Sequence, residues 1–177
     1  MKQFASGHAM QSAWVVDDLD AAVDAWLKVG IGPFFYVEYT PELFEESTYR
    51  GSPSPISMKI ALAQAGDMQI ELIEPTGEQK NIYRDTVPEG KTAFHHLCYW
   101  TDDIDGEIAS LVAQGYEVAA TGQVAGGGAT FAYVDTSPVL GHMTELLTYS
   151  DDIKGMFDMV TAASIDWDGG DPKRQLG

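Results

Sequence analysis

Four side chains, at two pairs of matched positions, could bind one divalent cation. Gln11 and His96 lie 85 residues apart, and Glu71 and Glu145 lie 74 residues apart. The members of each pair have similar neighbours in the sequence, so they are expected to correspond in two halves of the chain. Together the four offer one imidazole nitrogen, one amide oxygen and two carboxylates, which suits nickel, cobalt, manganese or zinc. Two carboxylates would neutralise the double charge of such an ion.

Strand alternation puts three of these side chains among unusual neighbours. His96 shares a strand face with Cys98 and Trp100, and Glu145 lies among apolar residues of a second strand. Glu71 lies on the strand face opposite an apolar one, and it could face solvent or a cavity. Taken singly, such a histidine is more often a hydrogen-bonded core residue, and such a glutamate is more often a surface residue. An isolated buried charge is costly, so together they are expected to be partnered.

Two further histidines lie beside these positions. In a regular strand His95 points away from His96, and His142 points away from Glu145. Neither histidine is therefore expected at the same site unless a β-bulge intervenes.

The elements that position the four residues form a repeat. The segment "VVDDLDAAVDAWLKVGIG" aligns with "WTDDIDGEIASLVAQGYE", which places Asp18 on Asp103 and Gly30 on Gly115. Both segments predict a short strand, a helix capped by aspartate, an apolar stripe at helical spacing and a terminating glycine. Alternating apolar residues then predict strands at 56–64, 67–75, 116–124, 129–136 and 142–149.

One domain spanning 1–177 accommodates this repeat. A first module covers about 8–78, a linker 79–92 and a second module 93–149, followed by a helical tail over 150–177. In the tail, apolar residues at Ile153, Phe157, Val160 and Trp167 predict one helix face, and the last ten residues are expected to be frayed. The proline-rich stretch 39–57 predicts a loop, which could be a lid, a partner surface or a plain insertion.

Composition limits the classes of partner. A net charge of −17 argues against nucleic acid and anionic membranes, because both require clustered Lys and Arg. One cysteine, Cys98, excludes an internal disulfide and a cysteine-based zinc site. The chain lacks an apolar run of about 20 residues and an apparent signal peptide, so a cytoplasmic protein acting on a small molecule is expected.

The motifs resemble those of the vicinal oxygen chelate superfamily, which includes glyoxalase I, methylmalonyl-CoA epimerase, extradiol dioxygenases and bleomycin-resistance proteins. The resemblance covers about residues 8–149 and rests on "VVDDLDAAVDAW", "IELIEP", "HHLCYWTDDID" and "TELLT". It implies an α+β fold in which two paired βαβββ modules form a cupped mixed sheet, followed here by the C-terminal helix. It also implies a homodimer and a single divalent metal held by Gln11, Glu71, His96 and Glu145.

The resemblance further implies proton abstraction next to a metal-polarised carbonyl, with Glu145 as the base and Glu71 as its partner. An isomerase or epimerase acting on an acyl thioester or related α-carbonyl compound is the leading hypothesis. A glyoxalase I-type lactoylglutathione lyase is the second, because one kind of glyoxalase I has glutamine at the position of Gln11. The segment "VGIGPFF" looks closer to the epimerase-like branch. A metal-free binding or resistance protein is the alternative from another class.

Overall fold

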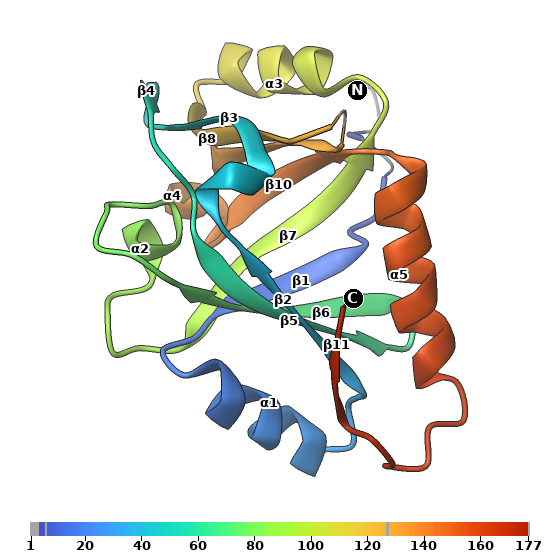
Figure 1. Cartoon of the computed structure of the whole chain (residues 1–177). Coiled ribbons are helices and arrows are strands. Elements are labelled where there is room, and N and C mark those ends of the chain that lie inside the picture. The colour runs from blue at the N-terminus through green and yellow to red at the C-terminus, as the bar shows by residue number, and fades with distance from the viewer. Residues whose placement is uncertain (1–3, 6, 127, 177) are drawn as a thin grey trace.

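The computed structural model describes residues 4–5, 7–126 and 128–176, and these build one large mixed sheet with helices outside it (Figure 1). Eleven strands follow the order β11-β2-β5-β6-β1-β7-β10-β9-β8-β3-β4 in the described residues. The strands are β1 Gln11–Val15, β2 Phe34–Tyr39, β3 Phe44–Tyr49, β4 Ser52–Pro53, β5 Met58–Ala65, β6 Met68–Pro75, β7 Ala93–Thr101, β8 Glu117–Val124, β9 Thr130–Asp135, β10 Met143–Thr148 and β11 Lys173–Gln175. The helices are α1 Leu19–Lys28, η1 Pro41–Leu43, α2 Tyr83–Thr86, α3 Ile104–Ala113, α4 Ser137–Leu140 and α5 Asp151–Ser164.

The duplicated architecture expected from the sequence is confirmed. One module runs β1-α1-β2-β5-β6, and the other runs β7-α3-β8-β9-β10. Within each module the first and last strands pair in parallel, β1 with β6 and β7 with β10. The modules meet where β1 and β7 pair antiparallel at the middle of the sheet. The fold is therefore α+β, with β6, β1, β7 and β10 as the four central strands.

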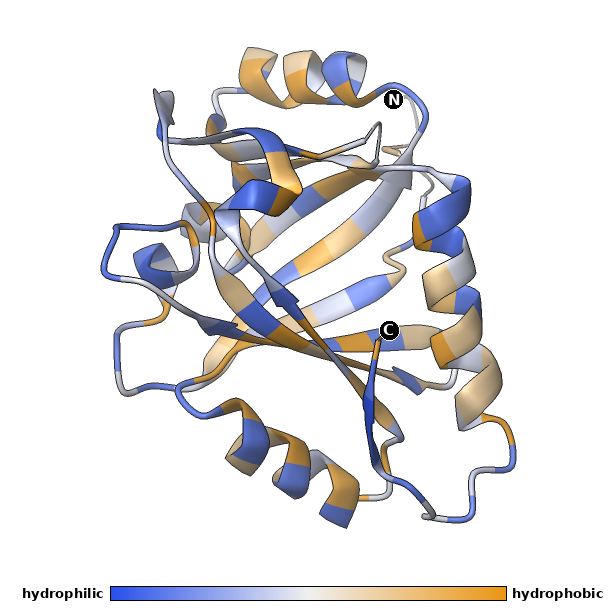
Figure 2. Cartoon of the chain, viewed as in Figure 1, coloured by the Kyte–Doolittle hydropathy of each residue, from blue (hydrophilic) through white to orange (hydrophobic). Residues whose placement is uncertain are grey.

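The two long module helices begin at the predicted caps. The Asp18 carboxylate accepts a hydrogen bond from Ala21 N, and the Asp103 carboxylate accepts one from Gly106 N. These bonds satisfy backbone donors that the first helical turn leaves without a partner. Polar and apolar residues alternate around the turns of α1 and α3 (Figure 2). The apolar residues of α1, including Leu19 and Val23, bury against one face of the sheet.

The opposite face of the sheet curves around a second apolar core. This core draws residues from both modules, among them Ile60, Phe131 and Met143. The segment predicted as a linker also contributes to it, because Tyr83 of α2 is almost fully buried there. Alternation in β6 separates the two cores: Ile70 and Leu72 face α1, while Ile73 faces the inner core.

The prediction of a loop over 39–57 is wrong. Residues Phe44–Tyr49 form β3, which pairs antiparallel with β8 of the other module, and β4 pairs with β3. The segment "FEESTY" has no apolar alternation that would predict a strand. Its backbone pairs with the edge of β8, so β3 does not depend on burying apolar side chains. Thr48 and Thr121 hydroxyls, 2.7 Å apart, add one side-chain hydrogen bond across this pair.

The tail differs from the prediction at its end. Helix α5 buries Val160 and packs Phe157 against the inner core, but it ends at Ser164, before Trp167. The last residues are not frayed: β11 adds to the sheet in parallel with β2, and Trp167 packs against Gly32. Backbone pairing, which apolar spacing does not reveal, holds this segment. No helix among the described residues is long and apolar enough to cross a membrane.

Candidate metal centre

The four residues singled out in the sequence come from the four central strands. Gln11 lies on β1, Glu71 on β6, His96 on β7 and Glu145 on β10. The register places both Glu71 and His96 opposite Ala13, on either side of β1. Parallel pairing between each module's first and last strands thus brings residues distant in the sequence to one point on the inner face of the sheet.

Three of these side chains converge closely. His96 Nε2 lies 3.0 Å from a Glu145 carboxylate oxygen and 3.5 Å from a Glu71 carboxylate oxygen. One candidate ligand atom from each residue lies within 4.8 Å of the others, a spacing compatible with shared binding of one cation. His96 is fully buried, and the Glu71 and Glu145 side chains are 12% and 9% exposed. Two buried carboxylates and an imidazole therefore form a cluster that water reaches only partly.

A β-bulge places His95 behind His96. Opposite β1, Ala13 pairs with His96 but the next residue, Trp14, pairs with Phe94, so His95 is the extra residue. The bulge turns His95 toward the inner side, where its Nδ1 lies 2.9 Å from Nδ1 of His96. His142 stays outside, with Nδ1 2.7 Å from its neighbour's carbonyl oxygen. The condition under which His95 would join the site is therefore met, whereas His142 remains apart.

The bonds of His95 determine which nitrogen of His96 carries the proton. His95 Nε2 lies 3.2 Å from Ile82 O, which can only accept, so Nε2 carries the hydrogen. Burial, and next the nearby His96, lower the pKa of His95 to about 3, so this ring is neutral and its Nδ1 accepts. His96 must then donate from Nδ1, so Nε2 is the His96 nitrogen that faces the two carboxylates.

This arrangement is unfavourable without a cation. His96 Nε2 is buried and has no hydrogen-bond partner among the described residues, and the groups it faces are the carboxyl groups of Glu71 and Glu145. A proton or a metal ion at this point would supply the missing positive charge, and the donor set suits a divalent ion. The residues present therefore fit a metal of the kind that the sequence led us to expect.

Gln11 borders the same cavity as Glu71 and Glu145. Its amide Nε2 donates to Gln69 Oε1 at 2.7 Å, so the Gln11 amide oxygen is left available. Gln11 and Gln69 are both 3% exposed and face each other across the parallel pairing of β1 with β6. The sequence contained a signal for Gln69, which alternates onto the face of Glu71, but nothing in its type pointed to an orienting role.

The charges of the cluster influence one another. Burial, and next the charge of Glu145, raise the pKa of Glu71 well above its usual value. Burial likewise raises the pKa of the Cys98 thiol, so this cysteine stays protonated and is part of the core, as expected from its apolar strand. Tyr133, whose ring centroid lies 5.1 Å from that of His96, also has a raised pKa because it is buried.

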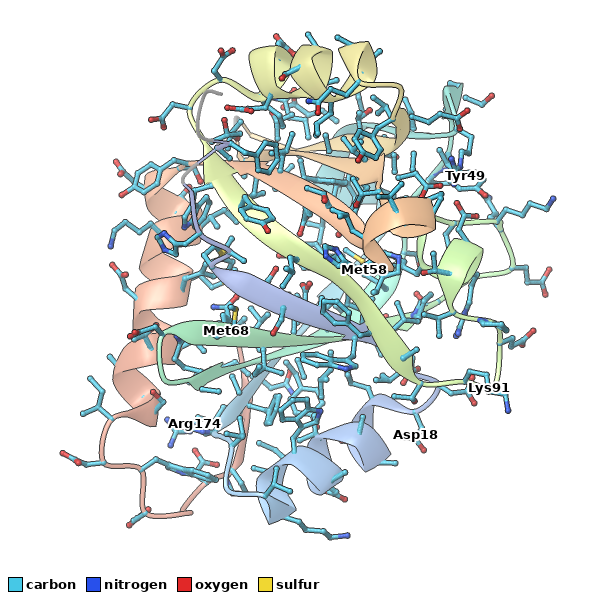
Figure 3. The ribbon with its side chains drawn as sticks, turned by 180° about the vertical axis from the view of Figure 1, so that it is seen from behind. Asp18, Tyr49, Met58, Met68, Lys91 and Arg174 are labelled. Carbon is cyan, nitrogen blue, oxygen red and sulfur yellow. The ribbon has the colours of Figure 1, made fainter. Side chains whose placement is uncertain are left out.

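The cluster opens into a mostly apolar cavity. The space amounts to about 600 Å³ with its open mouth included. Figure 3 shows Met58, one of the lining residues, near the centre of the molecule, whereas Lys91 lies at its edge. Ile153, Met156 and Phe157 of α5 contribute to the lining, so the C-terminal helix forms one wall.

Comparison with known proteins agrees with this architecture. Residues 10–133 match the family described as the Glyoxalase/Bleomycin resistance protein/Dioxygenase superfamily. No curated protein sequence shows a significant match. The fold is similar to methylmalonyl-CoA epimerase from Mycobacterium tuberculosis (TM-score 0.58, 16% identity, covering 88% of this chain and 96% of that one). It is also similar to a Streptomyces coelicolor methylmalonyl-CoA epimerase variant in complex with 2-nitronate-propionyl-CoA (TM-score 0.55, 18% identity, covering 84% and 99%).

Proposed function

The chain belongs to the glyoxalase/bleomycin resistance protein/dioxygenase superfamily, and from that premise we propose that it removes and returns a proton next to a substrate carbonyl. In this proposal Gln11, Glu71, His96 and Glu145 hold one divalent metal ion. Glu145 is the general base, and Glu71 is the second carboxylate of the reaction. The product is the epimer or an isomer of the substrate.

One observation supports this proposal above the others. A buried imidazole nitrogen, His96 Nε2, lies 3.0 Å from a Glu145 carboxylate oxygen and 3.5 Å from a Glu71 one, while His95 occupies Nδ1 of the same ring. A core histidine needs one partner at this nitrogen, whereas two carboxylates here gather more negative charge than a single hydrogen bond requires. The family resemblance gives the same four residues, but the geometry around His96 is independent of it.

The chemistry requires a base beside the substrate carbon. Glu145 would accept the proton as the C–H bond breaks, while the electron pair of that bond forms a C=C bond and the π electrons of the carbonyl move onto its oxygen. A metal ion held by the four residues would supply Lewis-acid stabilisation of the negative charge that develops there. Glu71 lies on the other side of His96 Nε2 from Glu145, so in this proposal it is the second carboxylate, the one that returns the proton. Return to the same carbon gives epimerisation, and return to its neighbour gives isomerisation.

Deuterium exchange tests this proposal directly. In D₂O, the protein should catalyse exchange of the α-hydrogens of a carbonyl substrate, and NMR follows their disappearance. Glu145→Gln keeps the size of the side chain but removes the base, so exchange should fall at least 100-fold. Glu38→Gln, a matched change at an exposed position on β2, should leave exchange unaltered. Exchange by Glu145→Gln at near wild-type rates would rule out Glu145 as the base.

Elemental analysis separates this proposal from a metal-free binding protein. Protein purified without added metal should carry about one divalent ion per chain, and Glu71→Gln with His96→Leu should carry none. A wild-type protein without stoichiometric metal, and without exchange after metal is added, would favour binding alone. The expected homodimer rests on the family resemblance, and sedimentation would test it.

A further inference from the structure

The walls of the cavity carry no side chain that could neutralise an anionic substrate. Beyond Gln11, Glu71 and Glu145, the described lining residues are aliphatic, aromatic or tyrosine side chains. No Lys or Arg occurs among them. Tyr39, Tyr83 and Tyr133 provide hydroxyl groups at the wall but no positive charge. An anion in this cavity would lose its hydration without gaining a counterion.

The cations nearest to the cavity in the sequence are directed elsewhere. Lys59 lies in β5 between Met58 and Ile60, which both line the cavity, so alternation directs Lys59 to the opposite face. It is exposed there and interacts with Asp20. Lys154 follows the lining residue Ile153 in α5, but it is exposed and its ammonium group pairs with Asp158.

Two arginines, Arg50 and Arg174, already form ion pairs or ring contacts with other residues. Arg50 forms ion pairs with Asp85 and Asp135, each at 2.7 Å. Arg174, on the edge strand β11, lies over the Phe35 ring at 5.5 Å and donates to the Asp171 carbonyl oxygen. Figure 3 places Tyr49, next to Arg50, and Arg174 at opposite sides of the molecule. Recruiting either arginine would require breaking these contacts.

The proposed metal would not attract an anion by net charge. A divalent ion held by Glu71 and Glu145 has both of its charges balanced by the two carboxylates. Any further carboxylate or phosphate near the centre would lose its hydration in a buried setting without a net positive charge to offset the loss. The overall charge of −17 adds a long-range repulsion.

Aromatic rings form part of the cavity wall. The Phe44 and Phe131 rings meet edge to face, with centroids 6.0 Å apart, and both line the cavity. Phe157 of α5 also lines it and packs beside Trp100 at 5.6 Å. Flat or branched apolar groups pack well against such surfaces.

Building on the proposed function, we propose that the substrates are uncharged carbonyl compounds with an apolar or aromatic body. In this assignment the carbonyl group of the substrate faces the carboxylate cluster, and its body lies against Phe44, Phe131 and Phe157. Thioesters with a polyphosphate carrier, and acids with a free carboxylate near the reacting carbon, would bind poorly.

A matched pair of probes tests this assignment on the metal-loaded protein. 2-Hydroxyacetophenone is uncharged, and 4-(hydroxyacetyl)benzoate has the same hydroxyketone with a carboxylate added to the ring. Titration calorimetry should give a Kd at least tenfold lower for the uncharged probe. Ile153→Lys, at the α5 wall, should reduce this preference at least threefold, whereas Ile165→Lys at an exposed position beyond α5 should not. Equal or tighter binding of the benzoate, or of methylmalonyl-CoA, by the wild-type protein would overturn the assignment.

Deuterium exchange on the same samples separates failure of this assignment from failure of the proposed function. Preference for the uncharged probe with α-hydrogen exchange supports both. The same preference without exchange supports the substrate class and counts against proton abstraction on this compound. Preference for the anion together with exchange overturns the substrate class and leaves the reaction type standing.

Discussion

Replacing His95 should weaken metal binding although His95 is not one of the proposed ligands. In the wild-type protein, His95 accepts a hydrogen bond from Nδ1 of His96 and thereby keeps Nε2 as the nitrogen that can bind a cation. In His95→Leu this acceptor is lost. The proton of His96 then either stays on Nδ1 as a buried donor without a partner, or moves to Nε2, the nitrogen that faces the carboxylates. Both outcomes disfavour the state that binds a cation.

The expected loss follows from either outcome. A buried donor left without a partner costs about 1–3 kcal/mol. Loss of a group that orients a metal-binding histidine typically reduces metal affinity about 10–100-fold, which corresponds to about 1.4–2.7 kcal/mol. The two ranges overlap, so we expect His95→Leu to bind divalent metal about 10–100-fold more weakly than wild type.

His95→Asn is the matched control. The asparagine amide oxygen falls near the position of the Nδ1 atom it replaces and can accept the same hydrogen bond, so most of the affinity should be retained. His142→Asn controls for removing a histidine outside the site, because the His142 ring lies against its neighbour's carbonyl oxygen and the Phe94 ring rather than in the cluster. Competition with a chromophoric chelator for nickel or cobalt would measure the affinities, and circular dichroism would verify folding. A folded His95→Leu within threefold of wild type, or equal losses in Leu and Asn variants, would refute the role of His95.

Three further outcomes follow from the structure. Glu71→Gln should raise the Tm of the metal-free protein at pH 7–8, because burial raises the pKa of Glu71 and its ionised form destabilises the fold. Near pH 4 this gain in Tm should vanish. A lower Tm than wild type at pH 8 would contradict the prediction. The pKa of His95 is lowered to about 3, so between about pH 6.5 and 3 only the unfolded chain binds a proton at this residue. As the pH is lowered through this range, the free energy of unfolding measured with urea should fall by up to about 1.4 kcal/mol per pH unit. The fall should be less steep in His95→Asn. Gly122→Ala would place a Cβ atom 2.3 Å from Phe131 Cζ. The variant should therefore lower the free energy of unfolding by about 1–3 kcal/mol and bind aromatic probes more weakly. Unchanged values of both would show that the Phe131 ring moves freely.

The sequence predicted the architecture because the duplicated segments are strong local signals. The capping residues Asp18 and Asp103 and the alternating strands define both modules. These patterns can be read without knowing which strands pair in the sheet. The segment Phe44–Tyr49 could not be predicted in the same way, because both faces of β3 are mostly polar and its partner is an edge of the other module. Strand β11 was not predicted for a similar reason. Its three residues have no apolar pattern and are held by backbone pairing.

The same distinction explains which parts of the site were visible in the sequence. The proposed ligands occupy corresponding positions in the repeat, so comparing the two modules reveals Gln11 with His96. The groups that orient them do not correspond. His96 is oriented by its neighbour in a β-bulge, His95, whereas Gln11 is oriented by Gln69 from an adjacent strand. The imidazole needs an acceptor at its far nitrogen, and the amide needs an acceptor for its NH₂ group so that its oxygen is free. Each module therefore orients its proposed ligand through a different local contact. Neither contact follows from the symmetry that reveals the ligands.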